Sequence, residues 1–118
     1  MNKVAIVVLA DTSEADGLGR VVNALMAAKE FVDGKDDVQI VFSGTGTKWL
    51  GELANPKHKL HDVYTSVKGH IAGACGFCAT AFGVVDSVKG SGARILEEYG
   101  TNMSFRRLLK DGYQVITF

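Results

Sequence analysis

The sequence predicts a single domain over residues 1–118, with a three-layer α/β/α fold around a mostly parallel five-stranded sheet. Strand-like apolar segments alternate along the chain with segments whose apolar residues recur at helical spacing, which is the pattern of βαβ units. The first apolar segment, residues 4–9, lacks alternation, as expected for a parallel strand covered on both faces. At 118 residues and 47% hydrophobic composition, the chain can bury such a core without metal or disulfide.

Five short segments have the composition of strands. They are mostly apolar and β-branched, and residues that favour turns bound them. The expected strands cover residues 4–9, 38–42, 70–74, 93–96 and 113–118. Because helical segments separate them, consecutive strands are expected to be joined by right-handed crossovers.

Three helices are expected in the first half of the chain. Apolar residues recur at helical spacing over residues 18–32, and Gly34 follows at the position of a left-handed cap. After the second strand, a turn leads into a short helix at residues 49–53. Asn55 and Pro56 match an N-cap followed by proline at the first helical position, so the third helix is expected to begin there.

Two more helices are expected in the second half of the chain. The apolar residues that mark one face of the first, which is expected to end at Gly90, are Cys78, Ala81, Phe82, Val85 and Val88. Ser104 is expected to cap the second helix, which ends at Gly112. The residues of this last helix that are expected to face inward are Phe105, Leu108 and Leu109.

Composition excludes several classes of function. Thirteen basic and thirteen acidic residues cancel, so no positive surface for nucleic acid or an anionic membrane is expected. No apolar run approaches the roughly 18 residues of a membrane span, and the opening apolar stretch does not resemble a secretory signal. Two cysteines three residues apart in such a chain indicate working thiols in a reducing compartment, so a cytoplasmic location is expected.

The two cysteines lie at the expected junction between the third strand and the following helix. Cys75 ends the strand and Cys78 falls in the first helical turn, in a C-x-x-C arrangement. The start of a helix lowers the pKa of a thiol, and the thiolate is the reactive form. Either thiol could act as a nucleophile while the other resolves a mixed disulfide or persulfide. The alternative is that both are inert core residues.

Three loops are expected to meet at the carboxyl edge of the sheet, where ligands of parallel sheets bind. The residues expected to line this site, besides the two cysteines, are Asp11, Thr12, Ser43, Gly44, Thr45, Gly46 and Gly76. Asp11 is interpreted first as a cap of the first helix and second as a group that orients a thiol. The segment 43–47 is interpreted as a turn with a threonine N-cap, with anion binding by its backbone as the alternative.

Two well-known uses of paired cysteines fit this chain poorly. Thioredoxin-like sites place proline beside the cysteines and a later cis-proline opposite them, whereas Pro56 lies upstream and is the chain's one proline. Zinc needs about four ligands, and the chain has two cysteines and three histidines. We therefore expect no metal and no cofactor.

The chain resembles the DsrE/DsrF-like family of small sulfur-relay proteins over essentially its whole length. The resemblance rests on the opening strand, on Phe42-Ser43-Gly44-Thr45-Gly46-Thr47-Lys48-Trp49, on the junction Gly73-Ala74-Cys75-Gly76-Phe77-Cys78-Ala79, and on the Gly-Tyr-led last strand. It implies a five-stranded α/β/α fold and assembly into homotrimers or hexamers. It also implies a partner protein that donates sulfur to this chain or accepts sulfur from it. The family's persulfide-carrying cysteine matches Cys75, whereas Cys78 is not general in the family.

The leading hypothesis is therefore a sulfur carrier that holds sulfane sulfur as a persulfide on Cys75, an accessible thiol of low pKa, with Cys78 assisting. A dithiol redox protein or switch that uses a Cys75–Cys78 disulfide is the second hypothesis. The third is a non-catalytic oligomeric binding module in which both cysteines only pack.

Overall fold

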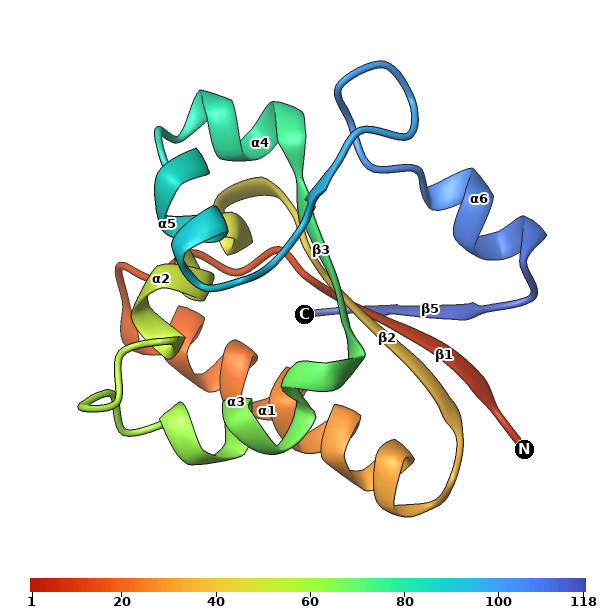
Figure 1. Cartoon of the computed structure of the whole chain (residues 1–118). Helices are drawn as coiled ribbons and strands as arrows, with labels where there is room; N and C mark the ends of the chain where they lie inside the picture. The colour runs from red at the N-terminus through yellow and green to blue at the C-terminus, as the bar shows by residue number, and fades with distance from the viewer.

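The computed structural model describes residues 1–118 and contains one five-stranded, all-parallel sheet. The strand order is β4-β3-β2-β1-β5, so the first three strands are neighbours in the middle of the sheet (Figure 1). The strands are β1 (Lys3–Val8), β2 (Asp37–Phe42), β3 (Ile71–Cys75), β4 (Ile95–Leu96) and β5 (Gln114–Thr117). The predicted fold class and all five strands are confirmed, with ends that differ from the prediction by at most two residues.

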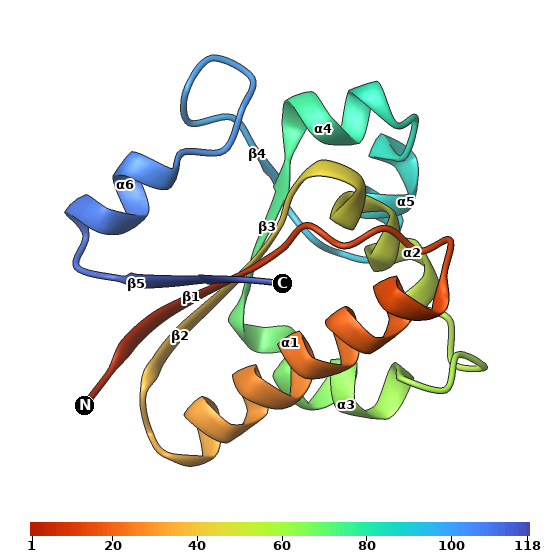
Figure 2. The same ribbon diagram turned by 180° about the vertical axis from the view of Figure 1, so that it is seen from behind.

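Helices cover the two faces of the sheet unequally. Figures 1 and 2 show α1, α2, α3 and α5 gathered on one side of the sheet and α6 alone on the other. None of the helices is long and apolar enough to cross a membrane. Their bounds are α1 (Ala15–Asp33), α2 (Trp49–Leu53), α3 (His61–Val67), α4 (Gly76–Ala81), α5 (Val85–Gly90) and α6 (Phe105–Lys110).

The unequal covering divides the core into a large and a small cluster. Strand β1 shows the division, because Val4 and Ile6 belong to an 18-residue cluster under α1, α2 and α3, whereas Ala5 and Val7 belong to an eight-residue cluster under α6. Both faces of β1 are therefore buried, which explains why its sequence shows no polar alternation. The smaller cluster contains Cys75, so the candidate thiol lies on the thinly covered face.

Two of the predicted helix ends in the first half are wrong. The third helix begins at His61, not at Pro56. Asn55 accepts a hydrogen bond from the backbone N–H of Lys57, so it closes a local turn rather than capping a helix. At the end of α1, Gly34 has a φ of −78°, and the left-handed residue is Lys35 with a φ of 65°. The helix therefore ends one residue later than a glycine cap predicts.

The predicted helix up to Gly90 is two helices, α4 and α5. Gly83 has a φ of 68°, which breaks the chain direction between them. The break leaves Ala81 and Phe82 exposed, although the helical spacing placed them on the buried face. The single-helix prediction fails because a glycine in the left-handed region ends a helix even when the apolar period continues beyond it.

The last helix is capped as predicted but buries one residue where three were expected. The Ser104 hydroxyl oxygen accepts a hydrogen bond from the backbone N–H of Arg107 at 3.0 Å. Leu108 is fully buried, whereas Phe105 and Leu109 are 43% and 63% exposed. Helix α6 is thus attached to the sheet through a single buried side chain.

Candidate functional site

The carboxyl ends of β1, β2 and β3 lie side by side, which confirms the predicted meeting of three loops. Val8 pairs with Phe42 across β1 and β2, and Phe42 pairs with Ala74 across β2 and β3. Ser43 therefore leaves the sheet next to Cys75, and its backbone N–H donates to the Val8 carbonyl at 2.9 Å. The end of the central strand β2 therefore places Ser43 beside the thiols.

A one-turn 3₁₀ helix, Gly44–Lys48, follows Ser43 and rests on the end of β1. The Thr45 hydroxyl donates to the Leu9 carbonyl at 3.0 Å, and the Thr47 hydroxyl donates to the Gly44 carbonyl at 2.9 Å. Thr47 is thus bonded inside the turn, and the interpretation of a threonine N-cap is wrong. Gly46 packs directly on the β1 backbone, since a Cβ there would overlap the Val8 carbonyl oxygen.

Cys75 is the last residue of β3 and is 1% exposed. Its Sγ accepts a hydrogen bond from the backbone N–H of Met103 at 3.4 Å and lies 3.8 Å from the Asn102 side-chain nitrogen. Sulfur accepts such bonds weakly when it is neutral and more strongly as a thiolate. The surroundings of Cys75 therefore favour its charged form.

Cys78 lies in the first turn of α4 and is partly exposed. Its Sγ is 3.8 Å from the Ser43 hydroxyl, and the backbone N–H of Gly44 also favours its thiolate. The structure therefore brings both cysteines together with Ser43 and Gly44, as the sequence predicted.

The two thiols have opposite pKa shifts. Burial raises the pKa of Cys75, but the backbone N–H groups of Cys78 and Met103 and the side chains of Cys78 and Ser43 outweigh it, so the net pKa is lowered. Burial raises the pKa of Cys78, and the neighbouring Cys75 raises it further despite Gly44 and Ser43. Cys75 is therefore the thiol that carries the negative charge first, because a shared site resists a second one.

A titration of the thiolate by its ultraviolet absorbance should show two steps, one below and one above the pKa of free cysteine. Lowering the pH through the first step protonates Cys75, so thiolate chemistry should decline there. In Cys75→Ala, Cys78 should titrate at a lower pH than the second step of the wild type, because the partner that raises its pKa is gone. A Cys78 titration that stays unchanged in this variant would contradict the assignment.

Asp11 and Thr12 lie outside the contacts of the thiols. The Asp11 carboxylate accepts from the backbone N–H of Thr12 at 2.7 Å and pairs with Lys48 at 3.3 Å. The bond from Thr12 is the main cause of the lowered pKa of Asp11. Helix α1 begins later, after Glu14, and has no side-chain cap. The prediction that Asp11 caps this helix is therefore wrong, and neither residue hydrogen-bonds to a cysteine.

The segment between β4 and α6 completes the site, although its sequence did not predict a place there. A tight turn brings Tyr99 and Asn102 together, and the Thr101 carbonyl accepts from the backbone N–H of Phe77 at 2.7 Å. Gly76 leaves room for this contact, because a Cβ there would lie 2.9 Å from the same carbonyl oxygen. Only Gly100 and Asn102 hint at a turn in the sequence; nothing in it indicates that Met103 donates to the thiol.

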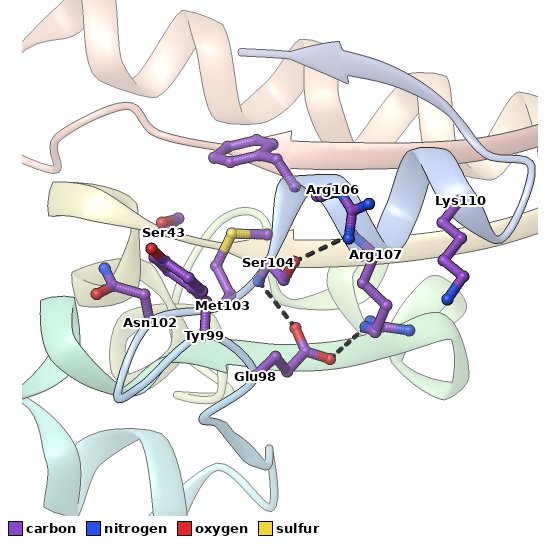
Figure 3. Close-up of a pocket in the computed structure, with 10 residues that line it drawn as sticks. Ser43, Glu98, Tyr99, Asn102, Met103, Ser104, Arg106, Arg107 and Lys110 are labelled. Atoms are coloured by element: carbon purple, nitrogen blue, oxygen red, sulfur yellow. Dashed lines mark hydrogen bonds and ion pairs between the residues drawn. The ribbon is translucent and has the colours of Figure 1, made fainter.

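A pocket of about 830 Å³ opens between this segment and α6, on the thinly covered face of the sheet. Figure 3 shows Ser43 and Asn102 at one end of it and Arg107 and Lys110 at the other. The residues that line the pocket are Ser43, Glu98, Tyr99, Asn102, Met103, Ser104, Phe105, Arg106, Arg107 and Lys110. No three histidine, cysteine, aspartate or glutamate side chains lie close enough anywhere in the chain to hold a metal ion.

Comparison with known proteins places the chain among relatives that match most of its length. A model of the DsrE/DsrF-like family matches residues 2–118. An uncharacterized protein of Methanocaldococcus jannaschii is 26% identical over 95 residues, which are 80% of this chain and 77% of that protein. A solved structure of a conserved protein of unknown function from Bacteroides thetaiotaomicron has a TM-score of 0.60 and 20% identity, and the match covers 97% of this chain and 94% of that one. The structural match shows the same fold.

Proposed function

We propose a sulfur-carrier function from the premise that the chain belongs to the DsrE/DsrF-like family. The family suggests sulfur relay in general, and the proposal adds that Cys75 holds sulfane sulfur as a persulfide. The observation that carries it is the placement of the Cys75 Sγ at the end of β3, where the backbone N–H of Met103 donates to it. A persulfide anion formed on this sulfur would still lie beside hydrogen-bond donors.

The transfer step needs no oxidant. The Cys75 thiolate attacks the outer sulfur of a donor R–S–SH, a new S–S bond forms on the protein, and the S–S bond of the donor breaks. The electron pair of the broken bond leaves with the donor as the thiolate R–S⁻. An acceptor thiolate later attacks the outer sulfur of the protein persulfide and takes it in the same way, which restores the Cys75 thiolate.

Access to Cys75 requires a movement. Its 1% exposure shows that the expectation of an accessible thiol is wrong for this conformation. The segment from Tyr99 to Met103 covers it, and two hydrogen bonds across that segment's turn hold the covering shape. The donor therefore reaches the sulfur when this exposed turn shifts, which needs no change in the sheet. Cys78, which is partly exposed, stands nearer the surface.

A dithiol function is the second candidate, because the Cys78 side chain is near enough to lower the pKa of the Cys75 thiol. Exchange with a small disulfide R–S–S–R would give a Cys75–Cys78 disulfide and two molecules of R–SH, so the electrons balance. In this case both cysteines are indispensable. In the carrier function only Cys75 is.

Intact-mass measurement after incubation with glutathione persulfide should show one added sulfur on the wild type and on Cys78→Ser. Cys75→Ser should gain none, because the nucleophile is missing. Treatment with dithiothreitol should remove the added sulfur. Equal uptake by Cys75→Ser would end the carrier proposal, and loss of activity in Cys78→Ser together with a disulfide between the two cysteines would favour the dithiol function. Assembly into a trimer or hexamer stays a prediction from the sequence, to be tested by sedimentation.

A further inference from the structure

The pocket between α6 and the 98–103 segment carries an excess of positive charge. Its lining contains the cations Arg106, Arg107 and Lys110 but only one anion, Glu98. Because the chain as a whole is neutral, this is a local concentration of charge and not a general property of the surface. Cations that line a concave, partly desolvated surface attract anions more strongly than cations on a flat surface do.

One of the three cations forms ion pairs within the protein, and the other two form none. Arg107 pairs with Glu98 at 2.6 Å and with Asp111 at 3.1 Å, and Glu98 also accepts from the backbone N–H of Ser104. This arrangement holds α6 against the segment and uses the only acid of the pocket. Arg106 and Lys110 make no hydrogen bond or ion pair with any side chain, so they are available to a ligand.

The other end of the pocket touches the thiol site. Ser43 lies 3.8 Å from the Cys78 Sγ, Asn102 lies 3.8 Å from the Cys75 Sγ, and Met103 donates its backbone N–H to Cys75. All three residues line the pocket. Neither cysteine lines the pocket itself, so the far end of a ligand held by the cations would meet Cys75 once the segment from Tyr99 to Met103 shifts.

We propose that this pocket binds the carboxylates of a small organic persulfide and directs its sulfur toward Cys75, an inference that rests on the proposed sulfur-carrier function. A volume of about 830 Å³ suits a compound of peptide size. A small molecule is favoured over a protein donor because the cations and the residues that contact the two thiols line the same hollow. Arginine binds a carboxylate through two parallel hydrogen bonds, and lysine adds a point charge.

The reaction is sulfur transfer from R–S–SH to Cys75, in which R is a small organic group that carries carboxylates. The carboxylates of R–S–SH bind Arg106 and Lys110, and Tyr99, Met103 and Phe105 provide apolar surface along the rest of the molecule. The Cys75 thiolate takes the outer sulfur, and the S–S bond of the donor breaks. The product R–S⁻ is released from the sulfur while its carboxylates are still bound to the two cations. Proton uptake by R–S⁻ from water completes the step.

The test compares two donors with the same reactive group. Glutathione persulfide carries two carboxylates, and the persulfide of 2-mercaptoethanol carries none. The double variant Arg106→Gln/Lys110→Gln should load sulfur from glutathione persulfide about 5-fold more slowly than the wild type, as expected for two exposed ion pairs. Its rate with the mercaptoethanol persulfide should not change. Lys89→Gln, an exposed lysine of α5 away from the pocket, is the matched control and should behave as the wild type.

A binding measurement tests the pocket independently of sulfur transfer. S-methylglutathione, which cannot transfer sulfur, should bind the wild type and Lys89→Gln alike and the double variant more weakly, in titrations followed by NMR. Suppose that the wild type loads sulfur and that the double variant matches it both in the rate of loading from glutathione persulfide and in the binding of S-methylglutathione. The pocket proposal is then overturned and the carrier function stands. If no donor loads Cys75, the carrier function fails, and absence of S-methylglutathione binding would then overturn the pocket as well.

Discussion

Gly46→Ala is expected to lower the free energy of unfolding by about 3 kcal/mol, at the upper end of the usual cost of overpacking. An added Cβ would overlap the Val8 carbonyl oxygen and would lie 2.7 Å from the Val8 carbonyl carbon and 3.2 Å from the Leu9 Cα. These are all backbone atoms at the end of β1, so no side-chain rotation can relieve the overlap. Relief requires the turn after β2 to move away from the sheet.

The same movement should reach the thiols. Ser43 and Gly44 lie in this turn and both face Cys78, while Ser43 also lowers the pKa of Cys75. Sulfur uptake by Gly46→Ala should therefore be slower than that of the wild type even at temperatures where the variant is folded. Urea unfolding gives the stability, and intact mass gives the uptake.

Gly19→Ala is the control for this substitution, because nothing lies within 4 Å of its added Cβ. Gly19 is in the interior of α1, where alanine is favoured over glycine by roughly 0.5–1 kcal/mol. This variant should be slightly more stable than the wild type and should load sulfur normally. Equal destabilisation in the two variants would contradict the packing of Gly46 on β1.

The sequence was sufficient to predict the fold because burial on both faces leaves a direct trace in it. Residues 4–8 are apolar without interruption, since α1 covers one side of β1 and the smaller cluster covers the other. The position of Cys75 followed from the same pattern, because the third apolar segment ends at it. The neighbourhood of Ser43 and the cysteines then required only that the first three strands be adjacent, which they are.

Much of the electrostatics of the thiols could not be predicted in this way. Cys75 is stabilised as a thiolate by backbone N–H groups of Cys78 and Met103. Every residue except proline has such a group, so its role depends on where the backbone runs and leaves no mark on residue identity. The segment that brings Met103 to Cys75 has no apolar period, and its path is set by the contact between Thr101 and Phe77.

The helix-end errors have a related cause. Asn55, Pro56 and Asp11 all carry the residue types of helix starts, but each side chain or ring is equally suited to a turn. Asn55 bonds to Lys57, and Asp11 bonds to Thr12. Local chemistry therefore indicates that the chain turns at these points, whereas packing against the sheet decides where the next helix begins.

Leu108→Ala is expected to lower the free energy of unfolding by about 3 kcal/mol, within the range measured for buried leucines. Leu108 is fully buried in the eight-residue cluster and is the only residue of α6 that is. The small cluster offers few side chains that could fill the cavity. The attachment of α6 should also loosen, and with it the placement of Arg106 and Lys110.

Leu109→Ala tests whether the loss of stability in Leu108→Ala comes from the burial of that side chain or simply from the removal of a leucine. The comparison is direct because the two leucines are adjacent on one helix. Leu109 is 63% exposed, so its truncation should change the free energy of unfolding by no more than about 0.5 kcal/mol. It should also leave the binding of S-methylglutathione unchanged, whereas Leu108→Ala should weaken it. Both leucines were expected to face inward on helical spacing alone, and that expectation predicts equal losses in urea unfolding. A large difference between the two variants would show that α6 is held to the sheet by one side chain and that the pocket depends on that contact.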